Sequence, residues 1–219
     1  GSADVMESLG VNLSLTADQV ARCIREVGIG FLFAPAVHSA TKYAQPARVE
    51  LKTRTVFNIL GPLTNPADAS AQLVGAPNPQ AAELMAEALA ELGLARGFVV
   101  HGSDGLDEIT TTGPTVAFEI ARGEVARVEL TPEAFGVARA SSDELKGGDR
   151  EANAATVRAI LCGAAGPKRD IVLVNAAATL VAAGAAADFP EGMRLAAESI
   201  DSGAAGARLE SLVRFTRRF

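Results

Sequence analysis

The residues best suited to chemistry stand together at positions 101–112, which read His-Gly-Ser-Asp-Gly-Leu-Asp-Glu-Ile-Thr-Thr-Thr. The adjacent carboxylates of Asp107 and Glu108 cannot share one face of a strand, but in a loop both can turn towards one hard cation. Mg²⁺ takes oxygen ligands of this kind and keeps waters for a phosphate partner. The residue types therefore favour a divalent-cation site, although an isolated Asp-Glu pair is more often a solvated acidic turn.

Candidate residues elsewhere in the chain also have ordinary structural interpretations. A lone histidine such as His38, which follows an apolar run and a proline, is more often a hydrogen-bonded structural residue than a catalyst. Residues 147–149 read Gly-Gly-Asp, which suggests a phosphate loop at first sight, but a turn that caps the following helix fits them better. Cys23 and Cys162 have no Cys or His partner at ligand spacing, so we expect both to be buried thiols of a reducing compartment.

Composition and charge limit the class of protein. The chain has 219 residues, of which 48% are hydrophobic, so it is long enough to bury the core of one large domain or two small ones. The net charge of −6 argues against a general nucleic-acid binder, which needs a clustered basic face. The sequence shows no signal peptide, and no apolar run reaches the roughly 18 to 20 residues of a membrane span. We therefore expect a soluble, cytoplasmic protein with no nucleic-acid or membrane partner.

Residues 102–112, which we call the acidic loop, follow a buried strand that we expect at residues 96–101. An earlier strand at 71–75 and an amphipathic helix at 79–92 complete a βαβ unit, which implies a parallel, right-handed crossover. Alternating apolar residues over 115–120 and 123–130 predict an antiparallel hairpin near the sheet edge. Because open α/β folds bind ligands outside the carboxyl ends of their strands, this arrangement would place the acidic loop where a ligand binds.

Helices are expected on both sides of this unit. They are predicted at residues 3–9, 16–27, 39–52 with an interruption at Pro46, 150–161, 170–184, 191–201 and 205–219. The apolar run at 31–33 is interpreted as a buried strand or tight segment, and the stretch at 55–66, with its Gly-Pro and Asn-Pro pairs, as a buried corner. Asn175 is the one large polar residue in an apolar helix, so its amide should hydrogen-bond within the core.

Taken together, these stretches resemble the anthranilate phosphoribosyltransferase family, and the resemblance runs from Gly1 to the C-terminal helix. Its most specific parts are residues 1–4 with 9–10, 28–35, 54–66 and 101–108. The resemblance implies an α/β fold of the nucleoside phosphorylase and phosphoribosyltransferase type. Its central sheet would be mixed and mainly parallel, flanked by helices, with an antiparallel edge hairpin and a helical C-terminal part. Residues 1–219 would be the C-terminal part of the large α/β domain, with 35–66 packing towards an N-terminal helical domain.

The resemblance also implies an activity and a set of site residues. The family joins the amine of anthranilate to C1 of phosphoribosyl pyrophosphate, a step of tryptophan biosynthesis, and releases pyrophosphate with Mg²⁺. By resemblance, Asp107 and Glu108 bind Mg²⁺, Arg48 engages anthranilate and Ser2 contacts phosphoribosyl pyrophosphate. Three further residues fall in stretches that line the path of anthranilate: Pro35, His38 and Gly61. Positioning and metal neutralisation can supply most of the acceleration, so no nucleophilic side chain is required.

Several parts of the family pattern have no counterpart in these 219 residues. They are the glycine-rich phosphate loop, the Asn-x-Ser-Thr segment, the Lys-His-Gly-Asn segment and the N-terminal helices of the homodimer interface. We therefore expect the chain alone to bind phosphoribosyl pyrophosphate poorly and to be inactive. The family forms homodimers, but the resemblance does not extend to the interface helices, so it does not imply a homodimer for these residues alone. Two other interpretations stay open: a class II pyrimidine nucleoside phosphorylase, and a non-catalytic fragment or paralogue with a structural role. Arg48 together with Asp107 and Glu108 favours the transferase.

Overall fold

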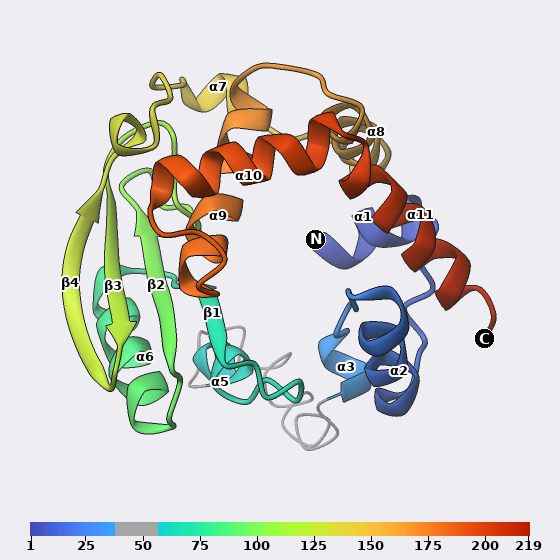
Figure 1. The fold of residues 1–219 in the computed structure, drawn as a ribbon, viewed down its shortest axis with the longest axis horizontal. Helices are drawn as coiled ribbons and strands as arrows, with labels where there is room; N and C mark the ends of the chain where they lie inside the picture. Colours follow the sequence, from blue (N-terminus) through green and yellow to red (C-terminus); the bar gives the residue numbers. More distant parts are fainter. Residues whose placement is uncertain (38–56) are drawn as a thin grey trace, which may run out of the picture. The chain divides into compact units, whose positions relative to one another are not determined.

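The computed structural model describes residues 1–37 and 57–219, and these fall into two compact units (Figure 1). The first unit contains Gly1–Gly61, Gly147–Gly163 and Ile200–Phe219, and the second contains Pro62–Lys146 and Ala164–Ser199. Each unit is thus assembled from segments that are far apart in the sequence. Helices α5 (Phe57–Leu63) and α10 (Phe189–Asp201) carry the chain from one unit into the other.

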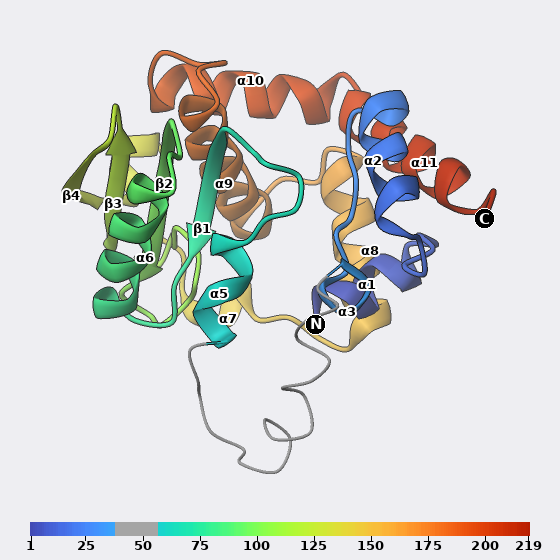
Figure 2. The same cartoon turned by 90° about the horizontal axis from the view of Figure 1, so that it is seen from below.

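The second unit is built on a sheet whose four described strands lie in the order β1-β2-β3-β4 (Figure 2). The strands are β1 (Ala71–Gly75), β2 (Arg96–Gly102), β3 (Thr115–Ala121) and β4 (Glu124–Leu130). Strands β1 and β2 are parallel and are joined through α6 (Pro79–Glu91), so the predicted βαβ unit is confirmed. The antiparallel pairing of β3 with β4 at the end of the strand order confirms the predicted edge hairpin.

The balance of strand directions differs from the expected mainly parallel sheet. Of the three pairings among the described strands, β1–β2 alone is parallel, whereas β2–β3 and β3–β4 are antiparallel. The reason lies in the loop at residues 103–114, whose two ends are held together because the Ser103 N–H donates to the carbonyl of Pro114 at 2.9 Å. The chain consequently starts β3 beside the end of β2 and must run back. The mixed α/β class predicted from the sequence is confirmed.

Helices cover both faces of this sheet. Helix α9 (Pro167–Ala182) packs a row of buried residues, including Val174, Ala177 and Ala178, against Phe98 and Val100 of β2. Side chains alternate along a strand, so the fully buried Val99 faces the other side, which α6 covers. The short helix α7 (Ser142–Leu145) contacts α9, and a 3₁₀ turn at Pro132–Phe135 places Phe135 in the same core as α9. The acidic loop therefore extends from a strand that is packed on both faces.

The described part of the first unit is helical. Its helices are α1 (Ser2–Ser8), α2 (Ala17–Val27), α3 (Ala34–Val37), α8 (Arg150–Leu161) and α11 (Ala204–Thr216). Helix α2 begins with the predicted capping box, because the Gln19 N–H donates to Thr16 Oγ1 at 3.3 Å and the Thr16 N–H donates to Gln19 Oε1 at 2.8 Å. Buried residues of α2 and α11, among them Cys23, Leu212 and Phe215, form the core of this unit.

Two local predictions were wrong, and a third is decided between its two alternatives. Residues 31–33 precede α3 and form a segment without strand pairing, in which Phe31 and Phe33 pack against the core of the first unit, so the tight segment is found and the buried strand is not. The expected buried corner at 55–66 contains helix α5, and residues 60–66 are exposed or half-buried. Cys162 is exposed because it caps the C-terminal end of α8, whereas Cys23 is buried as expected.

Two further points concern the part of the chain that is described. The helix predicted at 39–52 lies almost wholly outside the described residues, so it stays a prediction. No helix within residues 1–37 and 57–219 combines the length and the apolar character that crossing a bilayer requires.

Candidate functional site

The acidic loop lies at the carboxyl end of β2, where it also meets the end of the neighbouring parallel strand β1. Both Asp107 and Glu108 are exposed, and the adjacent loop residue Ile109 is buried in the core under α9. Within the loop, the Gly102 N–H donates to the carbonyl of Leu106 at 2.8 Å. The structure thus places both predicted carboxylates in an exposed loop, at the sheet edge where open α/β folds bind ligands.

A third carboxylate, Asp104, holds the loop together from within. Its Oδ2 accepts hydrogen bonds from Thr110 Oγ1 at 2.6 Å and from Thr112 Oγ1 at 2.7 Å, and its Oδ1 accepts from the Leu106 N–H at 3.2 Å. Partial burial opposes ionisation of Asp104, but these hydrogen bonds outweigh it and lower the pKa of the carboxyl below its ordinary value. Asp104 is therefore a charged anchor of the loop, and its oxygens are occupied by neighbouring groups.

The surroundings of Glu108 disfavour its negative charge. Partial burial raises the pKa of the Glu108 carboxyl above its ordinary value, and the negative charges of Asp107 and Asp104 raise it further, although the side chain remains accessible to solvent. Such a concentration of carboxylates is relieved when a cation binds between them. The charges of Asp104 and Asp107 and the partial burial of Glu108 therefore make this loop a region of unfavourable negative charge.

The donor set fits Mg²⁺ better than a metal that needs a closed protein cage. Among the described residues, no group of three or more His, Cys, Asp or Glu side chains is arranged to hold a metal ion. Mg²⁺ is usually bound through one or two carboxylates together with waters and substrate phosphates. Because Asp104 is engaged by Thr110 and Thr112, Asp107 and Glu108 are the two carboxylates that could supply such oxygens.

Backbone groups of the loop are held by residues outside it. A Cβ added to Gly75, the last residue of β1, would lie 1.9 Å from the carbonyl oxygen of Asp107, so strand and loop backbones are in direct contact there. The side chain of Asn175 in α9 bonds both the N–H and the carbonyl of Ile109, at 3.0 and 2.9 Å. The predicted core hydrogen bond of Asn175 is confirmed. We did not predict from the sequence that Gly75 contacts the loop or that Asp104 holds it together. A glycine at the end of a strand can mark a close approach of another backbone, so the role of Gly75 could have been predicted.

Three of the other residues implied by resemblance lie in the described part of the first unit. Ser2 is exposed and is the first residue of α1, Pro35 lies in α3, and Gly61 is exposed in α5. Arg48 and His38 fall outside the described residues. The structure therefore brings Asp107 and Glu108 together in one loop, while the substrate-binding roles of the remaining five residues stay predictions.

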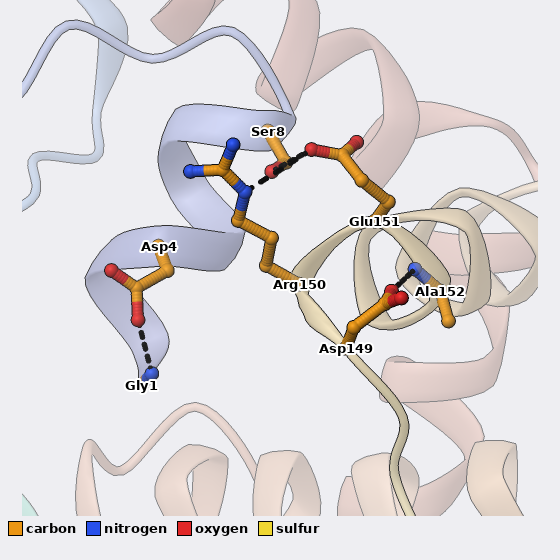
Figure 3. Close-up of polar contacts among 7 residues, drawn as sticks. All are labelled: Gly1, Asp4, Ser8, Asp149, Arg150, Glu151 and Ala152. Atoms are coloured by element: carbon orange, nitrogen blue, oxygen red, sulfur yellow. Dashed lines mark hydrogen bonds and ion pairs between the residues drawn. The ribbon is translucent and has the colours of Figure 1, made fainter.

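Helix α1, which carries Ser2, is tied to α8 within the first unit (Figure 3). Ser8 Oγ donates to Glu151 Oε1 at 2.9 Å, and Arg150 Nε lies 3.4 Å from the same oxygen. The last residue of α1 is thus held by Glu151 in the first turn of α8.

Residues 147–149 form a helix cap (Figure 3). The Asp149 carboxylate accepts from the Ala152 N–H at 2.8 Å, and the Asn153 side chain accepts from the Gly148 N–H at 2.9 Å and donates to its carbonyl at 3.0 Å. These amides already have protein partners, so the interpretation of the Gly-Gly-Asp stretch as a cap for α8 is confirmed.

Comparison with known proteins places the chain in a family. The model of the glycosyl transferase family, a/b domain, matches residues 1–206. The chain is 63% identical over 215 residues to an anthranilate phosphoribosyltransferase of Solibacter usitatus, a match that covers 98% of this chain and 63% of that protein. The chain therefore spans slightly less than two thirds of the length of this curated relative.

Solved structures give the same relationship. The crystal structure of anthranilate phosphoribosyltransferase from Thermus thermophilus matches with a TM-score of 0.92 and 46% identity, over 99% of this chain and 64% of that one. The Saccharomyces cerevisiae enzyme in complex with PRPP and Mg matches with a TM-score of 0.92 and 26% identity, over 100% of this chain and 62% of that one. Its complex with 4-fluoroanthranilate matches with a TM-score of 0.93.

The resemblance to anthranilate phosphoribosyltransferases that four stretches of the sequence predicted is confirmed by these matches, which extend over nearly the whole chain. The family model describes an a/b domain, and the unit that carries the acidic loop is likewise built from helices and a β-sheet. The chain belongs to the glycosyl transferase family that contains the anthranilate phosphoribosyltransferases.

Proposed function

We propose that this chain serves phosphoribosyl transfer from phosphoribosyl pyrophosphate to the amine of anthranilate, with release of pyrophosphate. The observation that carries the proposal is the acidic loop at the carboxyl end of β2, in which Asp107 and Glu108 are exposed while Asp104 is engaged internally. The 63% identity to the Solibacter usitatus enzyme supports the choice of reaction. The Saccharomyces cerevisiae complexes with PRPP and Mg and with 4-fluoroanthranilate support the choice of substrates and metal.

In this proposal, Asp107 and Glu108 supply the carboxylate oxygens for Mg²⁺. When bound there, Mg²⁺ would neutralise the charge that develops on the departing pyrophosphate. Gly75, Asp104 and Asn175 keep the two carboxylates in one place, so that little reorganisation is needed as charge builds up. The raised pKa of Glu108 is consistent with this role, because a cation would restore the charged form.

The remaining contacts are assigned by resemblance. The guanidinium of Arg48 would bind the carboxylate of anthranilate through paired N–H donors, which fixes the orientation of the aromatic ring. Ser2 would contact phosphoribosyl pyrophosphate, and Pro35, His38 and Gly61 would line the path of anthranilate. Displacement at the anomeric carbon proceeds through an oxocarbenium-like state, so positioning and charge stabilisation suffice without a nucleophilic side chain. A cytoplasmic location belongs to the proposal as well, and the homodimer is proposed only for a protein that also carries the N-terminal helices of the family interface.

A pair of binding titrations tests the proposal against its nearest competitor. Anthranilate is fluorescent, so its binding in the presence of Mg²⁺ and phosphoribosyl pyrophosphate can be followed directly in a protein that joins these 219 residues to the segments of the family pattern that they lack. The same titration with thymidine or uridine and inorganic phosphate tests the pyrimidine nucleoside phosphorylase alternative. We expect saturable anthranilate binding that chelation of the metal weakens. Binding of a nucleoside but not of anthranilate would replace the proposed function by the phosphorylase, and binding of neither would favour the structural role.

A further inference from the structure

The side chain of Asn175 holds the backbone that directly follows the acidic pair. The Ile109 N–H donates to Asn175 Oδ1 at 3.0 Å, and Asn175 Nδ2 donates to the carbonyl of Ile109 at 2.9 Å. The same Nδ2 donates to the carbonyl of Ile171, one turn earlier in α9, at 2.9 Å. One amide thus uses its acceptor and both donors, and two of the three bonds go to a single loop residue.

These bonds fix two consecutive peptide planes. The N–H of Ile109 belongs to the plane that also contains the carbonyl of Glu108, and the carbonyl of Ile109 belongs to the next plane. On the other side of Glu108, the plane that contains the Asp107 carbonyl is packed against Gly75, where a Cβ would come within 1.9 Å. Glu108 is therefore bracketed by restrained peptide planes, and the direction of its Cα–Cβ bond is determined by them.

The anchor itself is rigidly placed. The neighbours of Asn175 in α9, Val174, Ala177 and Ala178, have no measurable exposure and pack in the core of the second unit together with Ile109. The bond from Nδ2 to the carbonyl of Ile171 ties the amide to its own helix, so its orientation is set before the loop is considered. Because the Asn175 side chain is held by its own helix, its position is determined by α9, and the loop residue Ile109 is held in place relative to α9.

We propose that Asn175 is a positioning residue for the acidic pair: it sets the direction in which Glu108 presents its carboxylate beside Asp107 and so supports cation binding without touching the cation. The inference rests on the proposed function for the identity of the cation. Outer residues that orient metal ligands typically change metal affinity about 10- to 100-fold when they are replaced.

Two variants and a matched control separate positioning from general stability. Asn175→Ala removes all three bonds. Asn175→Asp keeps an acceptor for the Ile109 N–H but loses both donors. Thr179→Ala is the control, because Thr179 lies one turn further along α9, is exposed, and donates to the backbone carbonyl of Asn175 at 2.8 Å without touching the loop. Circular dichroism and urea unfolding establish that each variant is folded under the assay conditions.

The first readout is hydrogen exchange of the Ile109 amide in the metal-free chain, resolved by NMR. We expect exchange at least about 10-fold faster in Asn175→Ala than in wild type, since loss of one such bond costs about 1.4 kcal/mol or more. Asn175→Asp should fall between the two, and Thr179→Ala should match wild type. Equal rates in Asn175→Ala and Thr179→Ala would overturn the proposal, whether or not a metal binds.

The second readout is binding of Mn²⁺ alone, followed by electron paramagnetic resonance. We expect Asn175→Ala to raise the Kd for Mn²⁺ about 10-fold or more and Thr179→Ala to leave it unchanged. An unchanged Kd in Asn175→Ala would overturn the link between anchoring and cation binding. If wild type bound no Mn²⁺ while the Ile109 amide still exchanged faster in Asn175→Ala, the cation site of the proposed function would fail and the anchoring of Ile109 would stand.

Discussion

Gly75 and Asp107 are in direct backbone contact: a Cβ at position 75 would lie 1.9 Å from the carbonyl oxygen of Asp107 and 2.8 Å from its carbonyl carbon. Real Cβ atoms do not approach backbone this closely, so the end of β1 can pack on the acidic loop only because residue 75 is a glycine. The contact joins the first strand of the βαβ unit to the residue that we propose as a metal ligand. The last residue of β1 therefore contacts the backbone of the proposed metal ligand directly.

Replacing Gly75 by Ala should therefore push the Asp107 peptide out of place. We expect the free energy of unfolding to fall by about 1 to 3 kcal/mol, the usual cost of overpacking, together with weaker Mn²⁺ binding. Urea unfolding followed by circular dichroism measures the stability change. Gly206→Ala is the control, because Gly206 lies in α11 and a Cβ there would meet its nearest neighbour, the carbonyl oxygen of Leu161 in α8, at an ordinary 3.7 Å. That control should be neutral or stabilising by up to about 1 kcal/mol, and a Gly75→Ala variant as stable as wild type would contradict the close contact.

Replacing Arg48 by Ala should weaken anthranilate binding much more than binding of phosphoribosyl pyrophosphate. A lost charge-assisted pair of hydrogen bonds corresponds to about 1.5 to 3 kcal/mol, or roughly a 10- to 100-fold rise in the Kd for anthranilate. Fluorescence titration with anthranilate and calorimetry with phosphoribosyl pyrophosphate give the two constants, measured in a protein that joins these 219 residues to the segments of the family pattern that they lack. An Arg48→Lys variant keeps the charge but not the paired donors, and we expect it to recover only part of the affinity. An equal loss for both substrates would remove the assigned role.

The two cysteines should react with iodoacetamide at very different rates. Cys162 is exposed at the end of α8, whereas Cys23 is buried and its thiol donates to the carbonyl of Ile29 at 3.2 Å. Burial, with a smaller contribution from the charge of Glu26, raises the pKa of the Cys23 thiol, so less thiolate is present at a given pH. Mass spectrometry should find Cys162 alkylated first and Cys23 only after unfolding. Equal labelling of both residues in the folded chain would show that the core of the first unit opens readily.

The periodic parts of the chain were the most predictable from sequence. The βαβ unit, the edge hairpin and the capping box at Thr16 and Gln19 each rest on local patterns or local hydrogen bonds, and each was found. The mainly parallel sheet was not found among the described strands, because the direction of β3 depends on how the loop at 103–114 closes on itself. That closure depends on backbone hydrogen bonds within the loop, which the pattern of apolar and polar residues does not predict.

Short apolar runs were predicted less well. Residues 31–33 are apolar and follow Gly30, and residues 57–63 are mostly apolar and contain Gly61 and Pro62. Both patterns are compatible with a strand, a turn or a helix. In the structure, packing of Phe31 and Phe33 on the core of the first unit replaces sheet pairing, and α5 replaces the expected corner. Cys162 was misjudged for a similar reason, since its helical pattern ends one residue earlier and leaves the side chain exposed.

The candidate site was predictable in its chemistry but not in its support. Adjacent carboxylates after a strand identified Asp107 and Glu108, and an amide in an apolar helix identified Asn175 as a core hydrogen-bonding residue. Nothing in the sequence indicated that Asn175 would bond Ile109, 66 residues away, or that Gly75 would touch Asp107. Such pairings arise only when the strands and α9 have been brought together, so they became visible only in the structure.

The most direct test of the account is a Mn²⁺ titration of the chain and of its Asp107→Asn variant, followed by electron paramagnetic resonance. Asp143→Asn is the matched control, because Asp143 is an exposed carboxylate of α7 in the same unit. We predict that wild type and Asp143→Asn bind Mn²⁺ with the same Kd, and that Asp107→Asn raises this Kd about 10-fold or more. Equal binding by all three proteins would remove Asp107 from the cation site and contradict the account.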